Sequence, residues 1–218
     1  MPNTTVLKNV LNSLIADPPR HARWLNTVAL LEYTGARKML KSQASQRMSE
    51  MILRHAAEES RHAHFFKRCA LRIDPEVGEE FTAESLLCGD AAKAYFYQLD
   101  HGVCERLAAG GLAGDDLSYA SYLYVTTLIE ERADWLYPTY QKLLREAHLP
   151  ISLVGIIAEE EGHLKEMMVA LASVDDHFET RLEQLRPFEA GLFEQFLAAL
   201  CAELGLESAA AACASGRS

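Results

Sequence analysis

The sequence predicts an all-α fold. Ala, Leu and Glu are abundant, Gly and Pro stand mostly at segment boundaries, and the alternation of apolar and polar residues that is typical of strands is absent. The chain has 218 residues, 49% of them apolar, which is enough for one buried core and short for two ordinary domains. We therefore expect one helical domain over residues 1–218.

In the first half of the chain, each expected helix is followed by a polar, Pro-containing or Gly-rich segment. These helices cover about residues 5–15, 20–40, 46–72 and 90–109. The stop signals are Asp17-Pro18-Pro19, the polar residues 42–45, Asp74-Pro75 and the Gly-rich residues 109–114. The helix at 90–109 lies inside a long connection over 73–116.

Three further helices follow, over about residues 116–146, 149–172 and 175–204. Pro138 predicts a kink or a break in the first of them, and Pro187 predicts a bend in the last. Residues 207–218 are rich in Ala, Ser and Gly, which indicates a flexible tail. Two antiparallel helix pairs joined by the crossover at 73–116 predict a four-helix bundle over about residues 20–172, with extra helices around it.

The motif Glu-x-x-His occurs twice, as Glu59 to His62 and as Glu160 to His163. Residues three apart share one face of a helix, and both motifs lie on otherwise mostly apolar faces. An unpaired carboxylate is expensive to bury. Two such pairs therefore predict a shared compensating charge, a pair of metal ions.

A lone glutamate precedes each motif by one helix. Glu32 lies on the apolar face of the helix at 20–40. In the helix at 116–146, Glu130 and Glu131 both qualify, and we favour Glu130 because its neighbours on the helix face are small or carry hydroxyl groups. The candidate ligands are Glu32, Glu59, His62, Glu130, Glu160 and His163, with Glu131 as the alternative to Glu130.

Four carboxylates and two imidazoles favour two iron ions, with manganese or a mixed manganese and iron pair as alternatives. The set suits zinc poorly, because structural zinc prefers four closed nitrogen or sulfur ligands. The arrangement leaves coordination positions open, which chemistry with O2 requires.

These ligands resemble the ligand set of the ferritin-like di-iron carboxylate superfamily over about residues 20–172. Residues 58–63 (EESRHA) are similar to the E-E-x-R-H-A helix of such proteins. Residues 128–132 (LIEER) are similar to the I-E-A-R segment of the tRNA-modifying di-iron hydroxylases, which favours Glu130. The resemblance implies a ferritin-like fold, and it places Glu159 as an acidic partner of a metal-bound histidine.

The function expected first is an oxidoreductase that uses two iron ions to activate O2 and to oxidise or hydroxylate a small organic substrate. The chain has no flavin or nicotinamide fingerprint, so a separate reductase is an expected partner. The alternatives are a ferroxidase that handles iron, a non-catalytic helical interaction protein stabilised by metal and, less favoured, a tRNA-modifying hydroxylase. No binding-loop motif and no chain-binding tunnel is evident, so the substrate stays unnamed.

Charge and cysteine usage restrict the partners and the compartment. The formal net charge is −10 without a dense basic cluster, which disfavours nucleic-acid binding. The apolar stretches are too short for a membrane span, no signal peptide is evident, and five scattered cysteines favour a reducing cytoplasm.

Several other residues carry secondary expectations. His55 is either a partner of a metal ligand or an ordinary core or surface histidine, and Asp134 could orient a ligand. Four further histidines, His21, His101, His148 and His177, are expected at the surface. An apolar set in the last helix either covers the bundle or forms a homodimer contact: Leu192, Phe193, Phe196, Leu197 and Leu200.

Overall fold

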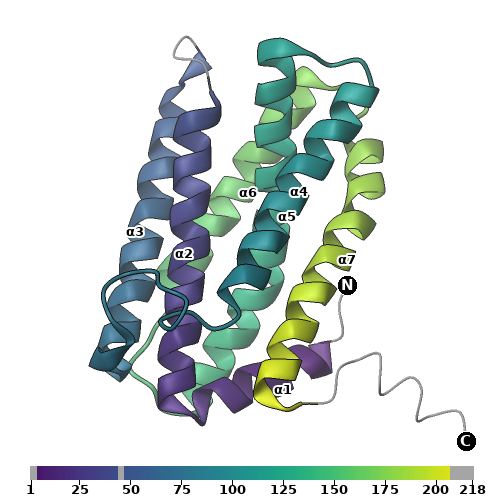
Figure 1. Cartoon of the computed structure of the whole chain (residues 1–218). Helices are drawn as coiled ribbons and strands as arrows, with labels where there is room; N and C mark the ends of the chain where they lie inside the picture. The colour runs from purple at the N-terminus through teal and green to yellow at the C-terminus, as the bar shows by residue number, and fades with distance from the viewer. Residues whose placement is uncertain (1–3, 44–46, 207–218) are drawn as a thin grey trace, which may run out of the picture.

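The computed structural model describes residues 4–43 and 47–206, and over these residues it contains α-helices, a short 3-10 helix at Pro75–Val77 and no strand (Figure 1). The all-α prediction is confirmed. The α-helices are α1 (Thr4–Ile15), α2 (Pro18–Ser42), α3 (Glu50–Ile73), α4 (Gly89–Ala109), α5 (Gly114–Glu146), α6 (Val154–Val174) and α7 (Phe178–Leu204). The tail predicted at 207–218, residues 44 and 45 of the predicted polar segment and residue 46 at the predicted start of the next helix lie outside the described residues.

Local capping sets the helix starts. Asp17 accepts a hydrogen bond from the Arg20 amide at 3.2 Å and caps α2, where proline occupies the first turn. Ser49 caps α3 in the same way through the Ile52 amide at 3.3 Å, so α3 begins later than the predicted residue 46. Helix α6 also begins later than predicted, because the Leu153 amide donates to the Gln141 side chain instead of continuing a helical turn.

Both internal prolines lie within continuous helices. Helix α5 runs through Pro138 and α7 runs through Pro187, so the predicted break at Pro138 is wrong. Pro138 is exposed. Water can therefore reach the carbonyl group that loses its helical partner, which keeps the interruption local.

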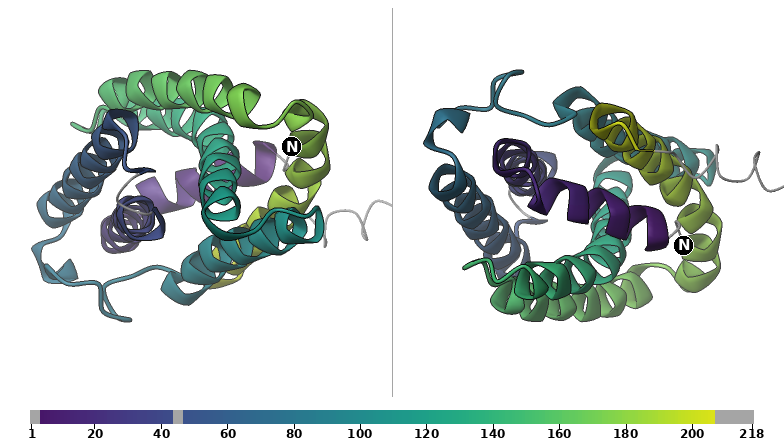
Figure 2. Two further views of the ribbon diagram at one scale, coloured as in Figure 1. Left: turned by 90° about the horizontal axis from the view of Figure 1, so that it is seen from above. Right: turned by 90° about the horizontal axis from the view of Figure 1, so that it is seen from below.

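The helices pack as two antiparallel pairs, α2 with α3 and α5 with α6 (Figure 1). Helix α4 carries the chain back along the length of the molecule, so that α3 and α5 run in the same direction. Helix α1 crosses one end and contacts α2, α5 and α7 (Figure 2). None of the described helices is long and apolar enough to span a membrane.

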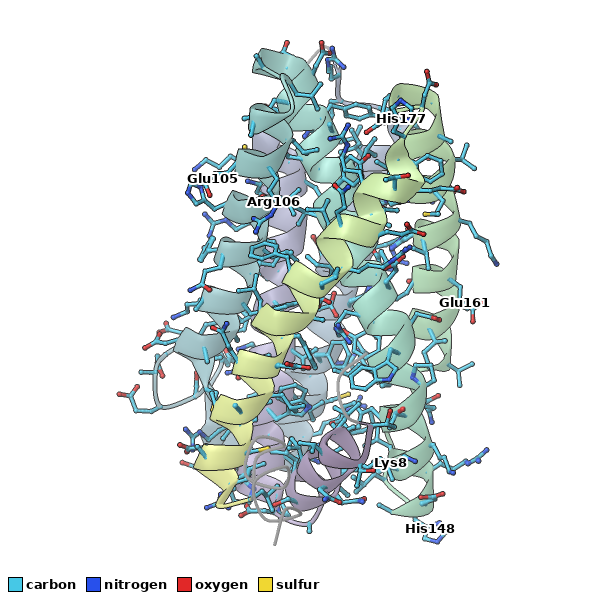
Figure 3. All side chains as sticks on the ribbon, turned by 90° about the vertical axis from the view of Figure 1, so that its right-hand side faces the viewer. Lys8, Glu105, Arg106, His148, Glu161 and His177 are labelled. Atoms are coloured by element: carbon cyan, nitrogen blue, oxygen red, sulfur yellow. The ribbon has the colours of Figure 1, made fainter. Side chains whose placement is uncertain are left out.

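Helix α7 lies obliquely over the outside of α4 and α5 (Figure 3). The apolar residues Leu192, Phe193, Phe196, Leu197 and Leu200 are all buried within the chain. Phe196 stacks on Trp24 of α2 and on Tyr95 of α4, with ring centroids 6.2 Å apart in each case. Of the two alternatives for this apolar set, covering the other helices is therefore correct, and a homodimer would need another surface.

Candidate metal centre

The six candidate ligands meet in the interior, between the two helix pairs. Helix α2 contributes one of them, α3 two, α5 one and α6 two, and each is at most 8% exposed. They are Glu32, Glu59, His62, Glu130, Glu160 and His163. Because all four helices present these groups to one point, residues up to 131 positions apart in the chain share a site.

The six residues form two overlapping groups. One group contains Glu32 and His62, and the other contains Glu130 and His163; Glu59 and Glu160 belong to both. Within each group the ligand atoms all lie within 4.8 Å of one another, close enough for one metal ion. The arrangement can therefore hold two ions, with two carboxylates shared between them.

Each histidine directs Nδ1 toward the carboxylates. His62 Nδ1 lies 3.1 Å from Glu160 Oε1 and 3.9 Å from Glu32 Oε2, and it is buried without a hydrogen bond of good geometry among the described residues. His163 Nδ1 lies 3.0 Å from Glu160 Oε2 and 3.4 Å from Glu130 Oε1. A neutral imidazole whose Nδ1 is free to accept is a good metal ligand.

The opposite nitrogens bind two further glutamates in a crossed pattern. His62 Nε2 of α3 donates to Glu159 of α6, and His163 Nε2 of α6 donates to Glu58 of α3, both at 2.7 Å. Such contacts fix the ring and, once the imidazole is neutral, leave Nδ1 as the acceptor that a metal ion can bind. For Glu159, this role as the acidic partner of a histidine was predicted in the sequence analysis. Sequence reasoning missed Glu58, although the tandem glutamates before each motif could have revealed it.

The crowded carboxylates shift one another's pKa. Burial and the neighbouring Glu59 raise the pKa of Glu32 well above its ordinary value, and burial and Glu160 do the same for Glu130. Burial opposes ionisation of Glu160 as well, but the adjacent imidazoles of His163 and His62 hold its pKa below the ordinary value. The site thus retains protons that a bound cation would replace.

Two aromatic side chains complete the wall beside Glu32 and Glu130. The Tyr137 hydroxyl donates a hydrogen bond to Glu32, and burial followed by the Glu32 charge raises the tyrosine pKa. The Tyr122 hydroxyl is buried without a hydrogen-bond partner among the described residues. Burial, Tyr119 and Glu130 raise its pKa, which places this hydroxyl within electrostatic reach of the carboxylates.

His55 packs against the candidate centre. It is fully buried, its ring centroid lies 4.1 Å from that of His163, and its Nε2 lies 2.9 Å from Glu166 Oε2. Burial and then the neighbouring His163 lower the pKa of His55, which favours the neutral ring. His55 is therefore a buried core histidine that also contacts a candidate ligand, so the two alternatives given for it in the sequence analysis do not exclude each other.

Several nearby residues lie outside the cluster. Glu131 binds Arg186 on α7 at 2.7 Å, so Glu130 and not Glu131 faces the interior. Asp134 is exposed, and the expectation that it could orient a ligand is wrong. Glu161 points away from α6 into solvent (Figure 3). His21 was expected at the surface but is buried against Tyr140, whereas His148 and His177 are exposed.

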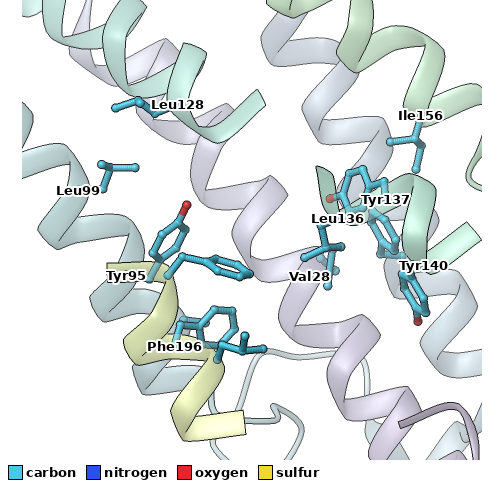
Figure 4. Packing of buried hydrophobic residues seen from close by; sticks show 14 of the residues in the cluster. Val28, Tyr95, Leu99, Leu128, Leu136, Tyr137, Tyr140, Ile156 and Phe196 are labelled. Carbon is cyan, nitrogen blue, oxygen red and sulfur yellow. The ribbon is translucent and has the colours of Figure 1, made fainter. Parts of the chain in front are cut away.

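A cavity of about 120 Å³ adjoins the carboxylates between α2 and α5 and is covered by α4 and α7. Its walls are mostly apolar, and Figure 4 shows Val28 and Leu136 on one side with Tyr95 and Phe196 on the other. Glu32 and Glu130 also line it. This cavity was not predictable from the sequence, because its walls come from helices that are distant in the chain.

Comparisons with protein-family models, with curated proteins and with solved structures return no match for this chain.

Proposed function

We propose that this protein is a ferritin-like di-iron oxidoreductase that uses O2 to oxidise or hydroxylate a small organic substrate. In this proposal α2, α3, α5 and α6 form the ferritin-like four-helix bundle, and α4 belongs to its crossover connection. The observation that carries the proposal is the pair of overlapping ligand groups that share Glu59 and Glu160.

The donor set fits two iron ions. Glu32 and His62 would hold one ion, Glu130 and His163 would hold the other, and Glu59 and Glu160 would be available to both. Carboxylate oxygens and imidazole nitrogens suit iron, with manganese or a mixed pair as the next choices. Among the described residues, Nδ1 of His62 has no hydrogen-bond partner, and this supports the fit, since a buried ring nitrogen without a partner is costly unless a metal ion binds it.

Two iron ions in such a site would supply the redox chemistry that activates O2. The surrounding residues have supporting tasks. Glu58 and Glu159 orient the two imidazoles, and the hydroxyl of Tyr137 holds Glu32 in place. The apolar walls of the cavity would exclude water from the reacting substrate.

The cavity favours oxidation of an organic substrate over iron storage or a purely structural metal. A route for iron ions would be expected to present polar groups, whereas this cavity is apolar and ends at the carboxylates. An electron donor is still required, and we propose a separate reductase. The described cysteines are free thiols, which supports a reducing cytoplasm.

Oxygen uptake by anaerobically Fe(II)-loaded protein tests the proposal. In the presence of a chemical reductant, a compound that fills the cavity should accelerate O2 consumption and be recovered in oxidised form. The Glu59→Ala variant should lose this activity, and the exposed-site control Glu161→Ala should keep it. A single rapid uptake of O2 that oxidises Fe(II), with a rate that no added organic compound changes, would favour the ferroxidase alternative.

A further inference from the structure

The cavity beside the carboxylates is elongated. Its lining residues run from Trp24 to Met39 along α2 and from Tyr122 to Tyr137 along α5. At a rise of 1.5 Å per residue, each stretch spans about 22 Å. Space that is spread over about four helical turns suits an extended chain better than a compact ring.

Gly35 leaves the outer part of this cavity open. It lies on the cavity wall one turn after Glu32, inside α2, and a Cβ atom at this position would meet nothing within 4 Å. Glycine is the least favourable residue in a helix interior apart from proline. Its presence here therefore preserves free space that any larger side chain would enter.

A basic hollow adjoins the cavity at this end. Its lining includes Arg37, Lys38 and Lys41 of α2 together with Phe96 and Tyr97 of α4, and Lys38 and Phe96 line the cavity as well. No acidic residue is among the described residues that line the hollow. Three cations at one hollow are a local exception in a chain with a formal net charge of −10.

We infer that the cavity and the hollow together bind a single-chain anionic amphiphile, with its alkyl chain beside the candidate metal centre and its carboxylate or phosphate head in the basic hollow. The chain would replace water along the apolar walls, and the head would interact with Arg37 and Lys41. As the identity of a substrate, this inference rests on the proposed function. As a statement about binding, it stands on the cavity and the hollow alone.

Charge balance places the head outside the cavity. Arg132 is the cation on the inner wall, and it is bound by Glu189 through Nε at 2.9 Å and Nη2 at 2.5 Å. At the mouth, Lys38 binds Asp100 at 2.6 Å. An anion drawn into the interior would find these cations already neutralised and would be costly to desolvate. In the hollow, Arg37 and Lys41 are exposed and remain hydrated.

Titration calorimetry on the full chain tests the inference, using alkyl carboxylates and alkyl phosphates of three to fourteen carbons. Affinity should rise about tenfold for each added pair of methylene groups until the cavity is full. Acetate and inorganic phosphate should not bind measurably, and decanol should bind about tenfold more weakly than decanoate. Comparing the two head groups identifies the natural one. Trp24 fluorescence reports the same binding, because Trp24 lines the cavity.

Two variants separate the chain site from the head site. Gly35→Leu should weaken decanoate at least tenfold, whereas Gly191→Leu should not, since Gly191 is also helical with an open Cβ position but lies off the cavity. Reversing Arg37 and Lys41 to glutamate should weaken decanoate about tenfold and leave decanol unchanged. The same reversal at the exposed Lys8, at the far end of the molecule (Figure 3), should have no effect.

Affinity that does not depend on chain length, or equal weakening by both leucine variants, would overturn the inference. Both tests read binding and not turnover. A protein that binds two iron ions but no alkyl chain would refute this inference alone. A protein that binds the alkyl chain but no iron would refute the proposed function, and with it the role of the alkyl chain as part of a substrate.

Discussion

Replacing Glu58 by glutamine should weaken metal binding although Glu58 is not a candidate ligand. Glu58 accepts a hydrogen bond from His163 Nε2 at 2.7 Å, and its side chain is 17% exposed. The substitution keeps the shape and removes the negative charge that makes imidazole a stronger ligand. Loss of such a partner typically costs 10- to 100-fold in metal affinity, or about 1.4 to 2.7 kcal/mol. Glu58→Gln should show about a tenfold loss, and Glu58→Ala more.

Glu159, which makes the corresponding contact with the other histidine, allows the two effects on metal affinity to be compared within one site. Glu159 makes the equivalent 2.7 Å contact with His62, but its side chain is 37% exposed and also binds Arg61 at 2.8 Å. Solvent screens this contact, so Glu159→Gln should lose less affinity than Glu58→Gln.

Competition between the protein and a chelator for Co(II) measures both affinities, with Glu161→Gln as the matched control. Thermal unfolding of each metal-free variant verifies that the fold is intact. The reasoning fails if Glu58→Gln stays within about twofold of the Glu161→Gln control.

Three further predictions follow from buried charge. Burial lowers the pKa of His21 from 6.5 to about 4, so the unfolded chain binds more protons in that range, and stability should fall by about 3 kcal/mol as the pH drops through it. Urea unfolding across pH would reveal this loss, and His21→Gln should abolish it. Metal binding at neutral pH should release at least two protons, because the pKa values of Glu32 and Glu130 are raised, and the raised pKa values of His62 and His163 add to this number; calorimetry in buffers of different ionisation enthalpy counts the protons, and no release would contradict the pKa shifts. Arg132→Met should destabilise the protein by about 3 to 5 kcal/mol by leaving the buried Glu189 carboxylate without its counter-charge. Adding Glu189→Leu should recover most of this loss in denaturant unfolding, and equal destabilisation in both variants would show that packing dominates.

Sequence periodicity predicted the helices well because each one buries an apolar face. Their starts were less predictable. Helix α3 begins at the residue that follows its cap, Ser49. Helix α6 begins beyond Leu153, whose amide donates a hydrogen bond to the side chain of Gln141. Pro138 did not break α5, because tertiary packing holds a helix whose proline faces water.

The candidate ligands were predictable because local spacing encodes them. A carboxylate and an imidazole on one apolar face are unusual, and the repeat of that pattern made it specific. The surroundings were not predictable, because they depend on contacts between helices. The pairing of Glu58 with His163, the burial of His21 against Tyr140 and the cavity at Gly35 all appear only when the helices are placed together.

Metal content per chain tests the central claim most directly. After anaerobic exposure to Fe(II) and removal of the excess, elemental analysis should find about two ions in the wild type and in Glu161→Ala. Loss of a ligand to one ion, as in Glu32→Ala or Glu130→Ala, should leave about one ion. Loss of a shared ligand, as in Glu59→Ala or Glu160→Ala, should leave less than one. A wild type that retains no metal, or a Glu161→Ala variant that loses as much as Glu59→Ala, would contradict the two-ion centre.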